Sequence, residues 1–224
     1  MKINFRLLVL LTTLFANFVF AQESTDEKNS IIKLNKNEYK LGNLLLDIDA
    51  NKITIPGIIN MNEGIIEVFA CSPGGKLHES LIVANILPYH LQVALLLLGI
   101  NPTDINDVKI TESLEKFGQI EIIVKWKIDD EETEMRAEKL IWNLSQGKPM
   151  QEVNWLFIGS KTINGVFVAN DNKSLITTFN DPYTIIENPL STRINDELYE
   201  VNKTLLPPIG TPVELVLNVK AGLQ

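Results

Sequence analysis

Two stretches of the chain alternate between apolar and mostly polar positions, which is the pattern of a strand with one face on a hydrophobic core. They are residues 120–128 and 213–219. Residues 155–158 and 166–169 are apolar on both faces, as in central strands, and Asn164-Gly165 predicts a hairpin turn before the second of them. Shorter strands are predicted at 43–48, 52–55, 65–71, 80–86, 135–142, 174–179 and 197–202. We therefore expect a chain rich in β-structure.

One segment, residues 88–99, has the pattern of a helix. Pro88 suits a first helical turn, and Gly99 stands where a helix commonly ends. Because the leucines at 95–98 cover every direction around the helix axis, we expect the helix to be buried nearly all round. The predicted fold class is α+β, with mostly antiparallel sheets packed around this one buried helix.

The first 21 residues have the features of a secretory signal peptide. Lys2 and Arg6 flank the start of an apolar run that ends in Val19-Phe20-Ala21, a small-x-small ending suited to signal peptidase. The apolar run is shorter than the ~20 residues that a membrane-spanning helix needs. We therefore predict cleavage between Ala21 and Gln22 and a protein that is free in the periplasm or the medium.

The rest of the chain is predicted to hold one domain. Residues 22–39 are polar and charged, which predicts a flexible tether. No second linker composition follows, so residues 40–220 are expected to form a single domain.

Charge and cysteine content exclude several classes of protein. Lysine and arginine number 20 against 28 aspartate and glutamate residues, for a net charge of −8, which argues against a nucleic-acid partner. The single cysteine, Cys71, excludes an internal disulfide, a CxxC redox pair and an iron–sulfur cluster. We expect no cofactor.

Cys71 and both histidines of the chain lie within twenty residues of one another. As an acyl-transfer site, Cys71 would be the nucleophile, His78 or His90 its base, and the amides of Gly74-Gly75 the oxyanion donors. Cys71 follows an apolar strand, however, where a buried and inert thiol is the ordinary outcome.

Two other kinds of site use the same segment. His78, Glu79 and His90 are candidate metal ligands with water as a fourth, although they do not form an HExxH motif. Gly74, Gly75 and Lys76 are candidates for an anion-binding loop, or for a plain Pro-Gly-Gly turn. The ligand-binding candidates are Gly74, Gly75, Lys76, His78, Glu79 and Ser80.

Two acidic segments have structural interpretations as well. Residues 129–132 carry four carboxylates between two predicted strands, which favours a solvated hairpin tip over a calcium site. Asp181 follows a predicted strand in Asn180-Asp181-Pro182, which is typical of a turn, and is also a candidate acid near the loop at 72–80.

Two segments of the sequence resemble those of a known protein family. They are Cys71-Ser72-Pro73-Gly74-Gly75-Lys76-Leu77-His78-Glu79-Ser80-Leu81 and Pro88-Tyr89-His90-Leu91-Gln92-Val93-Ala94-Leu95-Leu96-Leu97-Leu98-Gly99. With Trp155-Leu156-Phe157-Ile158, Asn180-Asp181-Pro182 and the ending Pro207-Pro208-Ile209-Gly210-Thr211-Pro212, they resemble the YdjY-like domain family of exported bacterial proteins. The likeness covers about residues 50–219. It implies export but no reaction, substrate or cofactor; some relatives are described as ferredoxin-like, which one cysteine cannot support. It also implies that the glycines at 74 and 75, Lys76, His78, Glu79, Ser80 and His90 belong to the family pattern.

These observations predict a noncatalytic exported domain that binds a partner or a small ligand at the cell envelope. The alternatives are a cysteine-dependent hydrolase or transferase at Cys71, and metal binding by His78, Glu79 and His90.

Overall fold

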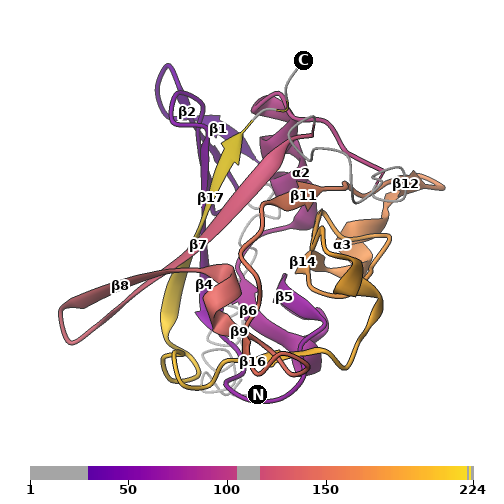
Figure 1. The fold of residues 1–224 in the computed structure, drawn as a ribbon. Helices are drawn as coiled ribbons and strands as arrows, with labels where there is room; N and C mark the ends of the chain where they lie inside the picture. The colour runs from indigo at the N-terminus through magenta and orange to yellow at the C-terminus, as the bar shows by residue number, and fades with distance from the viewer. Residues whose placement is uncertain (1–29, 105–116, 221, 223–224) are drawn as a thin grey trace, which may run out of the picture.

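The computed structural model describes residues 30–104, 117–220 and 222. In this part of the chain a sheet closes on itself as an eight-stranded barrel (Figure 1). Around the barrel the order is β4 (Lys52–Ile59), β17 (Pro212–Lys220), β7 (Gln119–Ile128), β11 (Trp155–Phe157), β15 (Ile186–Glu187), β14 (Ser174–Thr177), β5 (Val68–Cys71) and β6 (Ser80–Ala84). The pairing of β6 with β4 closes the barrel.

Further elements extend or cover the barrel. The sheet extends from β4 through β3 (Leu44–Asp47) and β2 (Glu38–Leu41) to β1 (Ile31–Lys33), and β8 (Glu131–Arg136) pairs with β7. One small sheet holds β9 (Ile141–Asn143), β10 (Lys148–Pro149) and β16 (Tyr199–Val201), and another holds β12 (Thr162–Ile163) and β13 (Val166–Phe167). The helices are α2 (Pro88–Leu97) and α3 (Val168–Asn172), and the 3₁₀ turns are η1 (Leu77–Glu79), η3 (Ala137–Leu140) and η4 (Ser191–Ile194). The fold is β-rich, and within the described residues the named strands pair antiparallel except β5 with β6 and β14 with β15.

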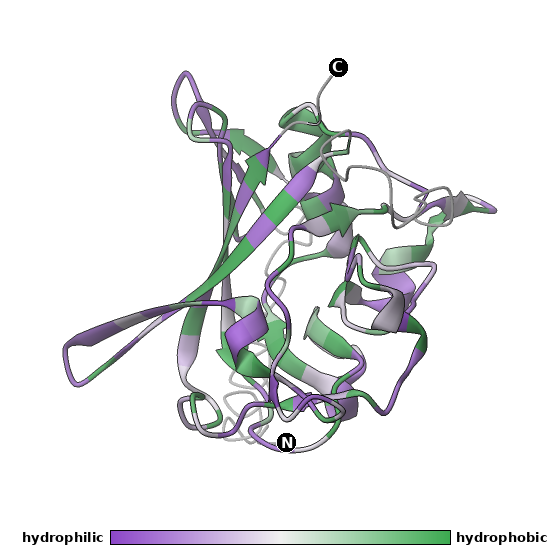
Figure 2. Cartoon of the chain, in the orientation of Figure 1, coloured by the Kyte–Doolittle hydropathy of each residue, from purple (hydrophilic) through white to green (hydrophobic). Residues whose placement is uncertain are grey.

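The predicted alternation on β7 and β17 is confirmed. Ile120, Ile122 and Val124 of β7 are fully buried, as are Leu215 and Leu217 of β17. These side chains belong to a single core cluster that fills the barrel. Figure 2 shows the same division, with hydrophobic residues on the barrel strands and a mostly hydrophilic arm where β8 leaves the barrel.

The hairpin turns also match their sequence signals. Asn164 and Gly165 have φ values of 50° and 82°, as a tight turn between β12 and β13 requires. Asp129 and Asp130, with φ values of 49° and 68°, form the tip between β7 and β8, so the four carboxylates at 129–132 stand on a hairpin tip as predicted.

The helix forms where it was predicted but is not buried all round. Leu91, Ala94 and Leu95 of α2 are fully buried in the core, whereas Leu96 and Leu97 are 44% and 49% exposed. The barrel is filled by its own inward side chains, and α2 packs beside β3, β14 and α3 with one face only. The sheet therefore does not wrap around a central helix.

Three further predictions are corrected. The tether predicted at 22–39 is wrong from residue 31 onward, because residues 31–33 and 38–41 form strands. Residues 22–29, like the predicted signal peptide, lie outside the described residues. Residues 166–169 are not a central strand, because β13 pairs only with β12 and Phe167 packs edge-on against Tyr89 at 5.8 Å. The predicted strand at 135–142 is interrupted by η3.

The interruption at η3 has a physical reason. It buries the carboxylate of Glu138, which accepts hydrogen bonds from Trp155 Nε1 at 2.9 Å and Arg136 Nε at 3.0 Å.

None of the helices in the described ranges is long and apolar enough to cross a membrane.

One edge of β4 changes partner along its length. Its first half pairs with β3, where Leu45 lies opposite Thr54, and its second half pairs with β6, where Ala84 lies opposite Gly57. Pro56, at the change of partner, has no N–H to donate to either strand. β3 and β6 therefore diverge at this point, and their ends form a fork in the sheet.

We expect Gly57→Ala to destabilise the fold and Gly57→Leu to destabilise it more. A Cβ at Gly57 would lie 2.9 Å from the backbone oxygen of Val83, so a side chain pushes β4 and β6 apart. Overpacking of this kind costs about 1–3 kcal/mol in the free energy of unfolding, measurable by urea denaturation. Gly147 is the control: it has φ of 60° but nothing within 4 Å, so Ala and Leu there should cost similar amounts. A Gly57→Leu variant as stable as the original would contradict this account of barrel closure.

Candidate functional site

The single cysteine lies at the end of β5 and is fully buried. Burial raises the pKa of the Cys71 thiol, so the thiol remains protonated at neutral pH. A nucleophilic role requires the thiolate and a base in contact with it. Cys71 has neither in this structure.

The two histidines occupy different surroundings. His78, in η1, has a side chain that is 80% exposed, and its Nε2 lies 3.5 Å from Glu79. His90, in the first turn of α2, is 1% exposed, and burial lowers the pKa of its imidazole. Neither ring nitrogen of His90 has a hydrogen-bond partner, so it is not the base of Cys71.

The predicted metal ligands are not brought together. Among the described residues no group of three or more histidine, cysteine, aspartate or glutamate side chains is placed to hold a metal ion. The prediction of a site made by His78, Glu79 and His90 is therefore wrong, because their nearness in sequence is undone by β6, which carries the chain away between η1 and α2.

The loop at 72–79 is a tight structural turn. Gly74 has φ of 75°, and a Cβ at Gly75 would lie 3.1 Å from the Cβ atoms of both Cys71 and Lys173. The ammonium of Lys76 pairs with Glu79 at 3.1 Å, and Ser80 Oγ donates to the carbonyl of Lys76 at 2.6 Å. These contacts hold the loop in its turn conformation.

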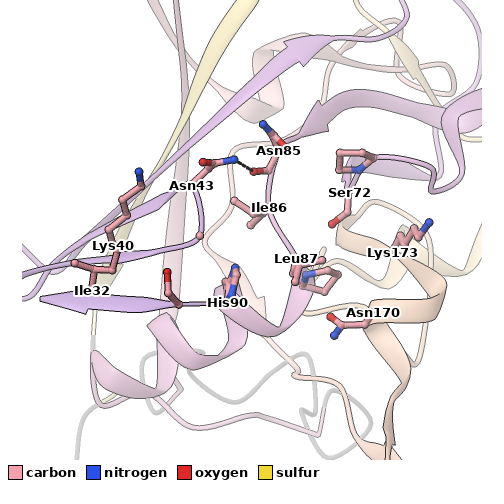
Figure 3. A pocket seen from close by; sticks show the side chains of 14 residues that line it. Ile32, Lys40, Asn43, Ser72, Asn85, Ile86, Leu87, His90, Asn170 and Lys173 are labelled. Carbon is pink, nitrogen blue, oxygen red and sulfur yellow. Dashed lines mark hydrogen bonds between the residues drawn. The ribbon is translucent and has the colours of Figure 1, made fainter. Parts of the chain in front are cut away.

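A pocket of about 470 Å³ opens beside this loop, at the fork between β3 and β6 (Figure 3). Asn43, in the turn before β3, donates through Nδ2 to the carbonyl of Asn85 at 3.1 Å and joins the two sides of the fork. We call this cavity the His90 pocket. It is lined by Ser30, Ile32, Lys40, Gly42, Asn43, Ser72, Pro73, Asn85, Ile86, Leu87, Pro88, His90, Asn170 and Lys173.

Buried polar atoms without partners distinguish this pocket. Ser72 is 2% exposed, and its Oγ has no hydrogen-bond partner; the same holds for both ring nitrogens of His90. A buried polar group without a partner costs about 1–3 kcal/mol. Such groups facing a cavity are therefore suited to a bound molecule.

The sequence identified only part of this site. Of the residues singled out as candidates, His90 lines the pocket, whereas Gly74, Gly75, Lys76, His78, Glu79 and Ser80 do not. Lys173 was missed because a lysine between two predicted strands, at 166–169 and 174–179, carries no sequence signal of its own. Lys40 and Asn43 were missed because they stand at the start of the predicted domain and of its predicted strand 43–48, where nothing in the sequence indicates a site.

A second buried polar cluster lies at the ends of β14 and β15. Arg193 Nε forms an ion pair with Glu187 Oε1 at 3.1 Å whose geometry is not that of a hydrogen bond. Both Glu187 oxygens and Thr177 Oγ1 are buried without a hydrogen-bond partner. Burial raises the pKa of Glu187 to about 7, with Arg193 opposing and Asp181 adding to the rise. Glu187 was also missed, since one acidic residue at the end of an apolar run carries no sequence signal of its own.

Asp181 was predicted as a turn residue or an acid near the loop at 72–80. Its carboxylate accepts from Asn172 Nδ2 at 2.7 Å and from the backbone N–H of Tyr183 at 2.9 Å. These two bonds hold α3 against the segment after β14, so the turn interpretation is confirmed.

A comparison with protein families identifies this chain. A family model described as the YdjY domain matches residues 16–218. The chain belongs to the YdjY domain family. The match includes every residue that lines the His90 pocket and the cluster around Glu187 in this YdjY domain. Searches of curated proteins and of solved structures found no match.

We expect the thiol of this YdjY domain to resist labelling in the folded state. Ellman's reagent reacts with thiolates, and Cys71 is buried with a raised pKa. Absorbance at neutral pH should show no release of thionitrobenzoate from folded protein, and one equivalent after unfolding in urea, because the chain has one cysteine. Rapid labelling of folded protein would restore Cys71 as a candidate nucleophile.

We expect Glu187→Gln to change how stability depends on pH. The carboxyl has an ordinary pKa of 4.5 when unfolded and about 7 when folded, so between these values the folded state holds a proton that the unfolded state releases. The contribution of Glu187 to stability is therefore lost as pH rises from 4.5 to 7, by on the order of 3 kcal/mol. Urea denaturation at several pH values should show Glu187→Gln gaining stability relative to the original protein across this window. Glu197→Gln, at an exposed carboxyl, is the control, and parallel pH curves for the original protein and Glu187→Gln would contradict the assignment.

Proposed function

We propose that this YdjY domain is a noncatalytic, exported protein that binds a small ligand in the His90 pocket. The observation that carries the proposal is that Ser72 and His90, two buried polar side chains without hydrogen-bond partners, line the same cavity. A volume of about 470 Å³ falls in the range of pockets that enclose small molecules.

The shape and lining of the pocket support a small molecule over a protein partner. The cavity lies within a fork of the sheet, and Ile86, Leu87 and Pro88 supply an apolar wall. Apolar walls with a few placed polar groups are typical of ligand sites, in which the polar groups fix orientation.

Binding is favoured over catalysis because the usual nucleophile–base contact is missing. Ser72 and His90 both line the pocket, yet neither Oγ nor the ring nitrogens have a hydrogen-bond partner. The thiol of Cys71 is buried and protonated. A nucleophile needs such a contact for activation.

The N-terminal segment supports export. Lys2 and Arg6, the apolar run after them and the Val19-Phe20-Ala21 ending have the order of a cleaved secretory signal. In this proposal the pocket meets its ligand in the periplasm or the medium.

We expect at least one of three small probes to bind in the His90 pocket: butanoate, butanamide or butan-1-amine. They share a short apolar body and differ in the charge of the head group. Two-dimensional ¹H–¹⁵N NMR titrations of the purified protein should show saturable shifts of the backbone amides of Ser72, Leu87 and Asn170.

Ser72→Ala should weaken that probe's binding about fivefold, since one hydrogen bond is worth about 1 kcal/mol. Ser191→Ala, at an exposed serine away from the pocket, is the matched control. The proposal is wrong if none of the three probes shifts the pocket amides. Turnover of p-nitrophenyl acetate that is lost in His90→Ala would contradict its noncatalytic part.

A further inference from the structure

We propose that the ligand of the His90 pocket is a small organic anion, with its anionic head at Lys173 and Ser72 and an apolar body along Ile86. This inference rests on the proposed function and adds the chemical class of the ligand.

The charge of the pocket is opposite to that of the chain. The chain has 28 acidic residues against 20 basic ones, yet the lining of the His90 pocket includes Lys40, Lys173 and His90 and no aspartate or glutamate. In an acidic protein, a cavity without carboxylates and with two ammonium groups favours a negatively charged occupant.

Neither lysine of the pocket has a carboxylate partner within the described part of the chain. Lys173 Nζ lies 3.4 Å from the carbonyl of Gly74, a long contact, and forms no ion pair; Lys40 forms none either. Elsewhere four lysines do pair with carboxylates at 2.5–3.1 Å: Lys76, Lys125, Lys127 and Lys139. Within the described residues, no carboxylate therefore neutralises either lysine of the pocket.

The backbone at Lys173 gives independent support. Lys173 ends α3 in the left-handed conformation, with φ of 60° and ψ of 14°, where glycine is the favoured residue. Its carbonyl accepts from the N–H of Ser72 at 2.8 Å, which holds it beside the loop at 72–79. This left-handed end of α3 therefore places Lys173 beside Ser72 at one end of the pocket.

The polar groups near Lys173 are donors. Ser72 offers an O–H, and a neutral imidazole at His90 offers one N–H. Asn170 Oδ1 already accepts from the backbone N–H of Tyr89 at 3.1 Å, which leaves its Nδ2 hydrogens to donate. Oxygen atoms of a carboxylate or phosphate accept such bonds, and charge-assisted bonds are the stronger ones.

The pocket is divided along its length (Figure 3). Ser72, Asn170 and Lys173 lie at one end, Ile32 and Lys40 at the other, with Ile86 and His90 between them. An anionic head at the first end thus places an attached carbon chain along Ile86 toward Ile32. This arrangement fits an organic acid better than a bare inorganic ion.

The test ranks the three NMR probes by charge. Butanoate should bind at least tenfold more tightly than butanamide, and butan-1-amine more weakly still. Hexanoate should bind more tightly than acetate, because its longer chain covers more of the apolar wall.

The variant Lys173→Gly distinguishes an effect of the lysine charge on binding from an effect on folding. Glycine suits the left-handed backbone, so this variant should unfold at the same temperature as the original protein or higher, while its affinity for butanoate falls about tenfold. Lys173→Arg should keep most of the affinity. Lys203→Gln, at an exposed lysine outside the pocket, should change neither quantity.

The outcomes distinguish this inference from the proposed function. Butanamide or butan-1-amine binding at the pocket amides as tightly as butanoate would overturn the anionic ligand and leave a small-ligand pocket. Unchanged butanoate affinity in Lys173→Gly would also overturn it, and equal affinities for acetate and hexanoate would overturn the apolar body. If none of the charged or neutral probes shifts the pocket amides, the proposed function itself falls.

Discussion

The pairing of β4 with three other strands is the constraint on which the rest of the structure depends. One edge of β4 pairs with β17 over nearly its whole length, and the other pairs first with β3 and then with β6. The second pairing closes the barrel and lets its inward side chains form one core. It is possible only because Gly57 allows the backbone of Val83 to approach closely. A barrel closed by pairing leaves no free edge on these eight strands, which protects them from pairing with other chains.

The same constraint creates the candidate site. When the edge of β4 changes partner at Pro56, the ends of β3 and β6 must separate, and Asn85 still donates its backbone N–H to the carbonyl of Pro56 at 2.9 Å. The space between the two ends is enclosed by α2 on one side and by the loop after β5 on the other (Figure 3). Polar atoms of Ser72 and His90 are thereby buried next to a cavity instead of within the packed core. The site is thus a consequence of how the barrel closes, and Ser72 and Pro73 of the loop after β5 form one of its walls.

The sequence was informative where a pattern is local. Alternation located β7 and β17, proline and glycine located the ends of α2, and Asn164-Gly165 located a turn. Barrel closure could not be predicted. It depends on the pairing of Gly57 with Ala84, and the hydrophobic pattern of a strand does not indicate which other strand it pairs with. The strand β1 was missed because it is only three residues long and exposed, so its two isoleucines form no apolar face opposite a polar one. The candidate site was only partly predicted: His90 was found from its nearness to Cys71, whereas Lys173 and Lys40 reach the pocket through tertiary contacts that leave no trace in local sequence.

Net charge and local charge lead to different conclusions about partners. A net charge of −8 argues against long polyanions such as nucleic acids, which contact an extended surface. At physiological ionic strength, however, charges more than about 8 Å apart are largely screened from one another. A small molecule inside the His90 pocket therefore responds mainly to the groups that line it, and the polar ones are two lysines, two serines, a histidine and three asparagines. Composition thus argues against one class of anion for this chain, while in our proposal the groups that line the fork favour another.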